Sequence, residues 1–222
     1  MLVINNRTLH STGSSLIEIL VILPVFLIVT LGVVQFIFIY EVKSTLNYAT
    51  FMAARSGAVN HVEKKSIVNG LVKSLIPIYS PSKNNQGILA AERKAFADIN
   101  KYSSISIINP TQEAFRDFAV RNHNSYRNEI PNDMLHMASS KIGASSGVNI
   151  QDANLLKIRV LYGYKLQVPF VNKIITIIAR KLTSNTEELY ILSNGRLPIQ
   201  ATATVRMQSA ARSNDWVQSR KR

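Results

Sequence analysis

The first feature of the sequence is a long run of apolar residues near its start. From Ile19 to Tyr40, 22 successive residues include no Asp, Glu, Lys or Arg. A bilayer core about 30 Å thick needs about 20 helical residues, so this segment is long enough to span a membrane. The alternative is a central buried helix, although so long an apolar run is rarely needed in a domain this small. A cleaved secretory signal fits less well, because such signals have apolar cores of about 7–15 residues and end in an A-x-A-like site.

After Tyr40 the apolar pattern becomes periodic. Small and apolar residues recur at spacings of three and four, at Leu46, Ala49, Ala53 and Gly57. This spacing predicts that the membrane helix continues as an amphipathic helix to Ala58. We therefore expect one helix over residues 14–58, with a membrane span over residues 19–40. The few basic residues flanking the span do not decide its orientation.

The remainder, residues 59–222, is expected to form a compact α+β domain. Three further helices are predicted. The first covers residues 62–75, with Asn60 as its N-cap and with Pro77 and Pro81 after its end. The second covers residues 88–101, and the third follows Thr111 as its N-cap. The stretch from Tyr79 to Gly87 has the composition of a linker.

Strands are predicted where apolar residues alternate with other residues. Residues 157–168 and 199–208 both have a two-residue period, which is typical of half-buried antiparallel strands. A shorter strand is expected at residues 104–108. The sequence LYILS, followed by Asn194-Gly195 and the last strand, favours a β-hairpin. The predicted fold class is thus α+β: a long N-terminal transmembrane helix that continues into a domain with a small antiparallel sheet and short helices.

One apolar segment between the strands has two interpretations. Residues Pro169 to Leu182 include Lys173, Arg180 and Lys181, and fourteen residues are too few to span a bilayer. The segment is either a helix packed on the sheet or a basic amphipathic segment that rests on a membrane surface or a partner.

Composition and charge narrow the chemistry. The chain has 222 residues, no cysteine, four histidines and a net charge of +13. The charge favours polyanionic neighbours such as lipid headgroups or envelope polymers, but no nucleic-acid recognition module appears. Without cysteine there are no disulfides, thiolate zinc sites or cysteine nucleophiles. We expect no enzyme activity, no cofactor and no metal site.

The weak candidates for chemistry are few. Glu187 and Glu188 are adjacent, and on a strand adjacent residues point to opposite faces, so a solvated turn is the better interpretation. A metal site built from His123, Asp133 and His136 has no ligand spacing to support it. The basic tail, Arg220 to Arg222, is expected to be solvated or to contact anionic headgroups.

The carboxylate of Glu18 is the most unusual residue of the N-terminal region. A carboxylate near the membrane core is costly and needs a reason. One reason is the positive end of the helix dipole. The other is chain cleavage after Gly13, which would leave a free ammonium on Ser14, one helical turn from Glu18. That ammonium could pair with Glu18 in the same chain or in an adjacent subunit.

These residues resemble a type IV prepilin signal, in which a short polar leader ending in Gly precedes an apolar helix with an early Glu. The stretch GSSLIEILVILPVFLIVTLGVVQFIFIYEVKSTLNYATFMAARSGA resembles the TadE-like pseudopilins of the Tad (tight adherence, Flp pilus) system. Weaker similarity extends to INPTQEAFRDFAV, IPNDML, LLKIRVLYGYKLQVPFV and LPIQATATVRMQ. The chain lacks the cysteine pair of some members, and no von Willebrand-type domain follows.

The resemblance implies a role and a location. A prepilin peptidase would remove residues 1–13 by cutting between Gly13 and Ser14. The mature protein would be a single-pass protein of the bacterial inner membrane, with its C-terminal domain in the periplasm. As a minor pseudopilin, it would contact other Tad pilins and the assembly platform in pilus biogenesis and adherence, and Glu18 would be its subunit contact. The alternative is an uncleaved membrane anchor whose basic outer domain binds envelope polymers or adhesion targets.

Overall fold

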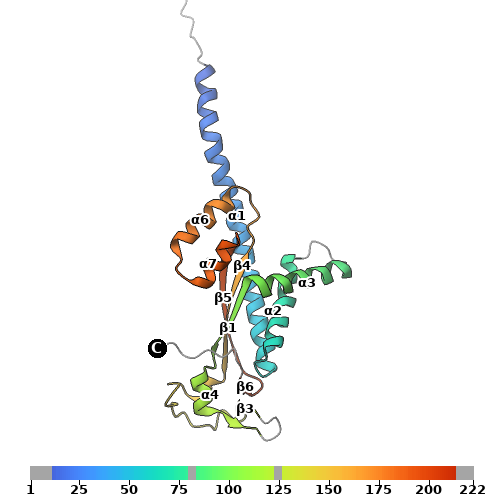
Figure 1. Ribbon diagram of the computed structural model, residues 1–222, viewed down its shortest axis with the longest axis vertical. Helices are drawn as coiled ribbons and strands as arrows, with labels where there is room; N and C mark the ends of the chain where they lie inside the picture. The colour runs from blue at the N-terminus through green and yellow to red at the C-terminus, as the bar shows by residue number, and fades with distance from the viewer. Residues whose placement is uncertain (1–11, 80–83, 123–126, 214–222) are drawn as a thin grey trace, which may run out of the picture.

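One helix dominates the molecule, and the rest of the chain packs around its C-terminal half. A computed structural model describes residues 12–79, 84–122 and 127–213, with the side chains of the first helix from Ile17 onward. Helix α1 (Thr12–Val59) contains 48 residues, so it is about 72 Å long at 1.5 Å per residue. Its N-terminal half projects from the folded domain as a bare rod (Figure 1). The predicted α+β class, with a long N-terminal helix, is confirmed.

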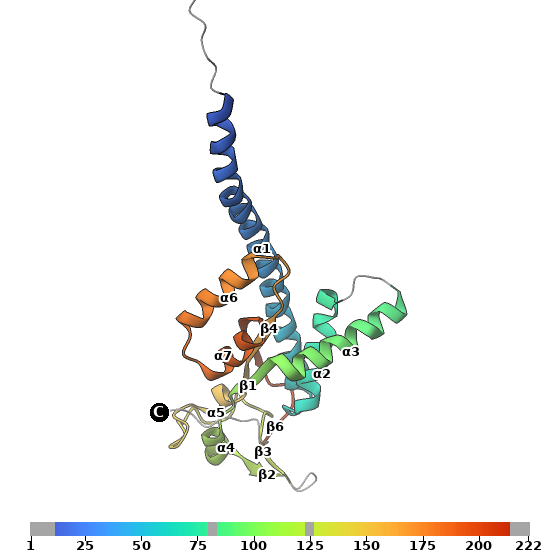
Figure 2. The same cartoon turned by 45° about the horizontal axis from the view of Figure 1, so that its top comes forward.

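Short helices and two small sheets make up the domain. The helices are α2 (Lys64–Tyr79), α3 (Asn85–Tyr102), α4 (Gln112–Phe118), α5 (Ile150–Ala153), α6 (Val171–Leu182) and α7 (Thr186–Ser193). The strands are β1 (Ser103–Asn109), β2 (Val120–Arg121), β3 (Asn128–Ile130), β4 (Leu155–Tyr164), β5 (Leu197–Arg206) and β6 (Ala211–Arg212). Helices α6 and α7 lie at the end of the domain near the bare rod, and α4 with β2, β3 and β6 lies at the opposite end (Figures 1 and 2).

The main sheet has the order β1-β4-β5, and all its pairs are antiparallel. Its alternation is the one predicted from the sequence: Ile158, Val160 and Tyr162 are buried on β4, and Ala201 is buried opposite Val160 on β5. The intervening Gln200, Thr202 and Thr204 are exposed. One face of the sheet therefore covers α1 and α2, and β5 displays polar residues on the other face.

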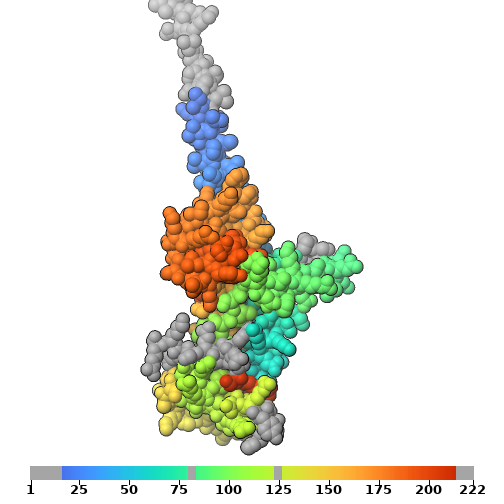
Figure 3. Space-filling view, in the orientation of Figure 1, coloured from blue at the N-terminus to red at the C-terminus, as the bar shows by residue number. Residues whose placement is uncertain are grey.

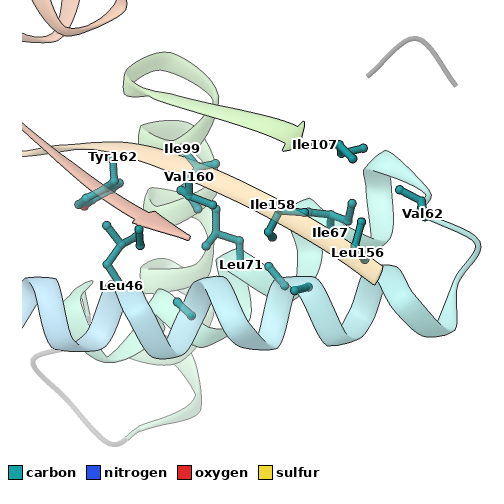
Figure 4. Packing of buried hydrophobic residues seen from close by; sticks show 14 of the residues in the cluster. Leu46, Val62, Ile67, Leu71, Ile99, Ile107, Leu156, Ile158, Val160 and Tyr162 are labelled. Carbon is teal, nitrogen blue, oxygen red and sulfur yellow. The ribbon is translucent and has the colours of Figure 1, made fainter. Parts of the chain in front are cut away.

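The core lies between α1, α2 and this sheet (Figure 4). Small residues on α1, among them Ala53 and Gly57, allow the other elements to approach closely. A Cβ atom added to Gly57 would lie 2.7 Å from Ile67 of α2 and 3.0 Å from Leu156 of β4. A Cβ atom on Gly70 of α2 would lie 3.1 Å from the Cα atom of Ala53. The recurring small residues noted in the sequence thus form the contact between the long helix and its domain.

We expect Gly70→Val to destabilise the domain by about 1–3 kcal/mol, because the atoms facing Gly70 include backbone atoms of α1, which can move only if the two helices separate. The matched control is Asn69→Val, which places the same side chain at an exposed position on the same helix. Thermal unfolding of both purified variants, followed by circular dichroism, measures the difference. Equal melting temperatures would contradict close packing at Gly70.

Helix α2 differs from the prediction at both ends. Asn60 is not its N-cap: its backbone N–H donates to Ser56 O (3.2 Å), so it belongs to the last turn of α1. The chain then turns through His61 and Val62, both with positive φ, before α2 starts. Pro77 does not end the helix, which continues to Tyr79. Proline lacks the backbone N–H that would donate to the preceding turn, and this loss is tolerated so close to the end of the helix. Pro81 lies outside the described residues.

The predicted hairpin before the last strand is wrong. Residues of the LYILS segment are helical and belong to α7. Asn194 and Gly195 end this helix: Gly195 has φ of +69°, its N–H donates to Leu192 O (3.0 Å), and Arg196 N–H donates to Ile191 O (3.3 Å). This is the pattern of a glycine C-cap. The dipeptide Asn-Gly is common both at such helix ends and in two-residue hairpins. Glu187 and Glu188 accordingly lie in the first turn of a helix, where the helix dipole favours acidic residues.

The other predicted elements are present with shifted bounds. Helix α3 covers the predicted helix, and it begins at Asn85 within the expected linker, of which residues 80–83 lie outside the described residues. Thr111 caps α4 as expected, accepting from Ala114 N–H (3.2 Å). Strand β4 ends at Tyr164 instead of Val168, because its partner β5 begins at Leu197 opposite that residue. Pro198 lies on β5, an edge strand, as its missing N–H requires.

Candidate functional site

Most of the N-terminal half of α1 is not covered by the rest of the described chain. From Ile17 to Val34 its side chains are exposed or partly exposed, including Leu20 (74%) and Phe26 (67%). This stretch is about 27 Å long as a helix, close to the thickness of a bilayer core. Among the helices of the described residues, α1 alone, over Ile17–Val59, is long and apolar enough to cross a membrane. Such a surface is unsuited to water, so lipid or other apolar helices must cover it.

Gln35, inside the apolar run, is the first buried side chain of α1 among those described, and it is fully buried. Its side-chain oxygen accepts a hydrogen bond from the backbone N–H of Val168 (2.9 Å). Val168 belongs to the segment that continues from β4 toward α6. The bond therefore fixes the connection between the sheet and α6 to the place where α1 leaves the domain.

The C-terminal end of α1 is also fastened to the domain. The carbonyl oxygen of Ala58 accepts from Gln208 N–H, Ser209 N–H and the Ser209 hydroxyl, each at 3.0 Å. Lys43, near the middle of the helix, donates to the carbonyl of Gln200 on β5. The C-terminal half of the helix is thus held by β5 and the chain that follows it.

Opposite its packed side, the C-terminal half of α1 presents a second exposed surface, which we call the outer stripe. Its members recur every three or four residues over five turns: Tyr40, Ser44, Tyr48, Phe51, Arg55 and Val59. Tyr40 (77%), Tyr48 (59%) and Phe51 (44%) are substantially exposed, and the Arg55 guanidinium lies 6.0 Å from the Phe51 ring centre. Exposed aromatic residues with an arginine are typical of protein contact surfaces. The outer stripe thus extends the exposed surface of the bare rod along the C-terminal half of α1.

The structure places the predicted processing residues at the start of α1. The backbones of Gly13 and Ser14 lie in its first turn, since the helix begins at Thr12, and Glu18 follows one turn later with an exposed side chain. In the intact chain Ser14 has a peptide nitrogen and no ammonium, so a Ser14–Glu18 ion pair requires cleavage. Cleavage would also require the first turn to open, which helix ends do readily. Residues 1–11 of the predicted leader lie outside the described residues.

One cluster of ionisable groups links several elements of the domain. Asp98 and Arg196 form a bidentate pair (3.1 and 3.2 Å), and Arg196 stacks on the Tyr102 ring at 3.8 Å. Tyr79 donates to the same carboxylate (3.2 Å) and bonds the Tyr162 hydroxyl, and its burial raises the pKa of the Tyr79 hydroxyl. This cluster joins α2, α3 and β4 to the start of β5.

At the opposite end of the domain two further carboxylates hold loops. Glu129 pairs with Arg212 (2.7 Å) and so links β3 to β6. Desolvation raises the pKa of Asp117, but hydrogen bonds from Ser146 and Ser145 outweigh it and lower that pKa to about 2. Within the described residues no group of three His, Asp or Glu side chains is placed to hold a metal ion. His123 lies outside these residues, and Asp133 and His136 are exposed.

Two functional features were not predicted from the sequence. Gln35 lies within the apolar run and gives no periodic signal. It is the only strongly polar side chain among its neighbours, and this could have indicated the end of the bare rod. The outer stripe was not predicted, because the small residues on the opposite face of the helix have the stronger periodic pattern. Tyr40, Tyr48 and Phe51 at helical spacing would have indicated it.

Comparisons with known proteins agree with this picture of α1. The family model described as TadE-like protein matches residues 13–55, a segment that includes Gly13, Ser14, Glu18 and nearly the whole helix. Neither a curated protein nor a solved structure matches the chain. Residues 13–55, within the long N-terminal helix, are therefore similar to the TadE-like family, in agreement with the resemblance noted in the sequence.

Proposed function

We propose that the chain is a minor pseudopilin of a Tad-type (Flp) pilus. It is inserted in the bacterial inner membrane by α1, its C-terminal domain lies in the periplasm, and it takes part in pilus biogenesis and adherence without enzymatic activity. The observation that carries the proposal is the coincidence of the TadE-like segment with a helix that has an unpacked apolar half and an exposed outer stripe.

The mechanism follows from the two halves of α1. A prepilin peptidase cuts between Gly13 and Ser14, and the new ammonium pairs with Glu18 of the same or an adjacent chain. When the pair joins two adjacent chains, it fixes the axial register of their helices in lipid, because an unpaired charge there is costly. The outer stripe extends the same helix contact beyond the membrane, toward other Tad pilins, pseudopilins and the assembly platform.

A photo-crosslinking experiment tests the helix contact. A benzoyl-phenylalanine in place of Tyr48 probes the outer stripe, and the same residue in place of Tyr190, an exposed tyrosine on α7, is the matched control. We expect covalent adducts with a Tad pilin or pseudopilin, identified by mass spectrometry, from position 48 and not from position 190. Adducts from position 190 alone, or from neither position in piliated cells, would favour the alternative of an anchor that works through its outer domain.

A further inference from the structure

Helix α6 exposes an apolar surface that the domain does not cover. Of its twelve residues only Val171 is buried. Ile174 (44%), Ile178 (53%) and Leu182 (81%) follow the i, i+4, i+8 spacing of one helix face, and Ile177 (58%) lies beside them. Residues 171–182 thus form the predicted helix, and Ile175 packs against the core, but the apolar residues on the other side of the helix are uncovered. Its inner side has limited contacts with α1 and α7.

A strained residue extends this surface at the start of the helix. Phe170 has φ of +65° and ψ of −51°, a conformation that is unfavourable for a bulky side chain. The N–H of Val171 donates to Pro169 O (2.8 Å) across it, which makes a tight γ-turn. This turn leaves the Phe170 ring 72% exposed, next to the isoleucine face. Strained residues of this kind are found at ligand-contact sites, so the exposed ring is a candidate for contact with a partner or a membrane.

The position of α6 identifies what can cover it. The hydrogen bond between Gln35 and Val168 holds the chain just before α6 at the first buried residue of α1. The 18 residues from Ile17 to Val34, which are largely uncovered, are about the length of a bilayer core, so the membrane surface on this account lies near Gln35, inside the span predicted over residues 19–40. In the space-filling view, residues of α6 form the end of the domain from which the bare rod emerges (Figure 3). The lipid headgroup region is therefore beside α6 whenever α1 is inserted.

The charges on α6 match such a surface. Lys173, Arg180 and Lys181 are exposed, and the helix contains no acidic residue. Basic residues near an anionic leaflet are attracted to its phosphates. Amphipathic helices with a basic polar side bury their apolar face at the boundary between headgroups and acyl chains.

We propose that α6 is a membrane-surface helix. Phe170 and the four exposed aliphatic residues of α6 insert into the leaflet where α1 emerges, and Lys173 and Lys181 bind the phosphates of anionic lipids. This inference rests on the proposed membrane insertion of α1. With α1 it gives the domain two points of attachment to the bilayer, which fixes the tilt and rotation of the domain and hence the direction in which the outer stripe faces.

The experiment uses the natural absence of cysteine, because any single cysteine can be labelled without further changes. Full-length protein carrying Ile178→Cys is labelled with the environment-sensitive dye NBD and reconstituted into phosphatidylcholine vesicles, with and without phosphatidylglycerol. Val25→Cys in the bare rod and Met137→Cys at the far end of the domain, both exposed side chains, are the two references. Quenching by lipids with a spin label on the acyl chain reports contact with the membrane.

We expect quenching at position 178 to be several-fold greater than at position 137, with a blue-shifted emission, and to increase with phosphatidylglycerol. The double variant Lys173→Gln, Lys181→Gln should abolish that increase. Quenching at position 25 together with none at position 178 would overturn the α6 proposal alone. Absence of quenching at position 25 would overturn the membrane insertion of α1 as well. Protection of position 178 from aqueous iodide without lipid quenching would show that a protein covers α6, and would also overturn the proposal.

Discussion

Replacement of Glu18 by alanine is expected to abolish pilus assembly and to leave the amount of protein in the membrane unchanged. The side chain of Glu18 is exposed, so its loss costs the fold of the isolated chain little. Removing a carboxylate from an apolar helix makes membrane insertion more favourable. The defect should therefore appear only where the helix meets another subunit.

The physical basis of this effect is the cost of an unpaired charge. After cleavage, the Ser14 ammonium of one helix and the Glu18 carboxylate of a neighbour can satisfy each other at one axial position only. A shift by one helical turn, about 5.4 Å, would separate the two charges in lipid. The carboxylate thus specifies the axial position of each helix relative to its neighbour. The apolar contacts of the bare rod do not specify this position, because they are similar at many positions along the helix.

Two variants make the test specific. Glu41→Ala removes an exposed carboxylate from the same helix outside the unpacked half and should leave piliation intact. Glu18→Gln keeps the size and polarity of the side chain without its charge, and should fail as Glu18→Ala does. Pili are counted by electron microscopy and the protein by immunoblot of membranes. Normal piliation with Glu18→Gln would contradict the charge-pairing mechanism.

Replacement of Gly13 by valine is expected to block removal of the leader. Resemblance to prepilin signals places the cut directly after this residue, and the structure places its backbone in the first turn of α1. Valine has a higher helix propensity than the glycine that it replaces, so the helix itself should persist. The retained leader keeps the Ser14 nitrogen in a peptide bond, and Glu18 then has no ammonium to pair with. We expect the uncleaved chain to accumulate and pili to be lost.

The control for this variant is Gly32→Ala, a second glycine of the same helix. A Cβ atom at Gly32 meets no described atom within 4 Å, so this change should allow both cleavage and assembly. If Gly13→Val is cleaved as efficiently as Gly32→Ala, the processing site is not where the sequence places it. If Gly13→Val is uncleaved and still supports normal piliation, cleavage is not needed for function.

Much of the fold could be predicted because its signals are local. The apolar run, the small-residue spacing on α1 and the alternation of β4 and β5 each follow from a single period in the sequence. The hairpin was mistaken because Asn194-Gly195 suits a helix end as well as a tight turn. The start of α7 distinguishes the two: Asn185 caps it by accepting from Glu187 N–H (3.0 Å), and Glu187 and Glu188 lie in its first turn.

The candidate site was predictable only in part, for a physical reason. Gly13, Ser14 and Glu18 are close in sequence, so a motif can carry them. The link between Gln35 and Val168 joins residues 133 positions apart and leaves no periodic trace. Likewise, the amphipathic pattern of α6 does not reveal whether its apolar face is covered by the sheet or left open, since both cases need the same residues. That distinction required the position of α6 beside the end of the bare rod.

The central claim is that α1 is a processed pilin-type helix, and the intact mass of the membrane-extracted protein tests it most directly. Protein from cells with a working prepilin peptidase should have the mass of residues 14–222, with Ser14 at its N-terminus by terminal sequencing. The Gly13→Val variant, prepared in parallel, should retain residues 1–13. A wild-type chain that begins at Met1 or Leu2 in such cells would contradict the claim and support the uncleaved anchor.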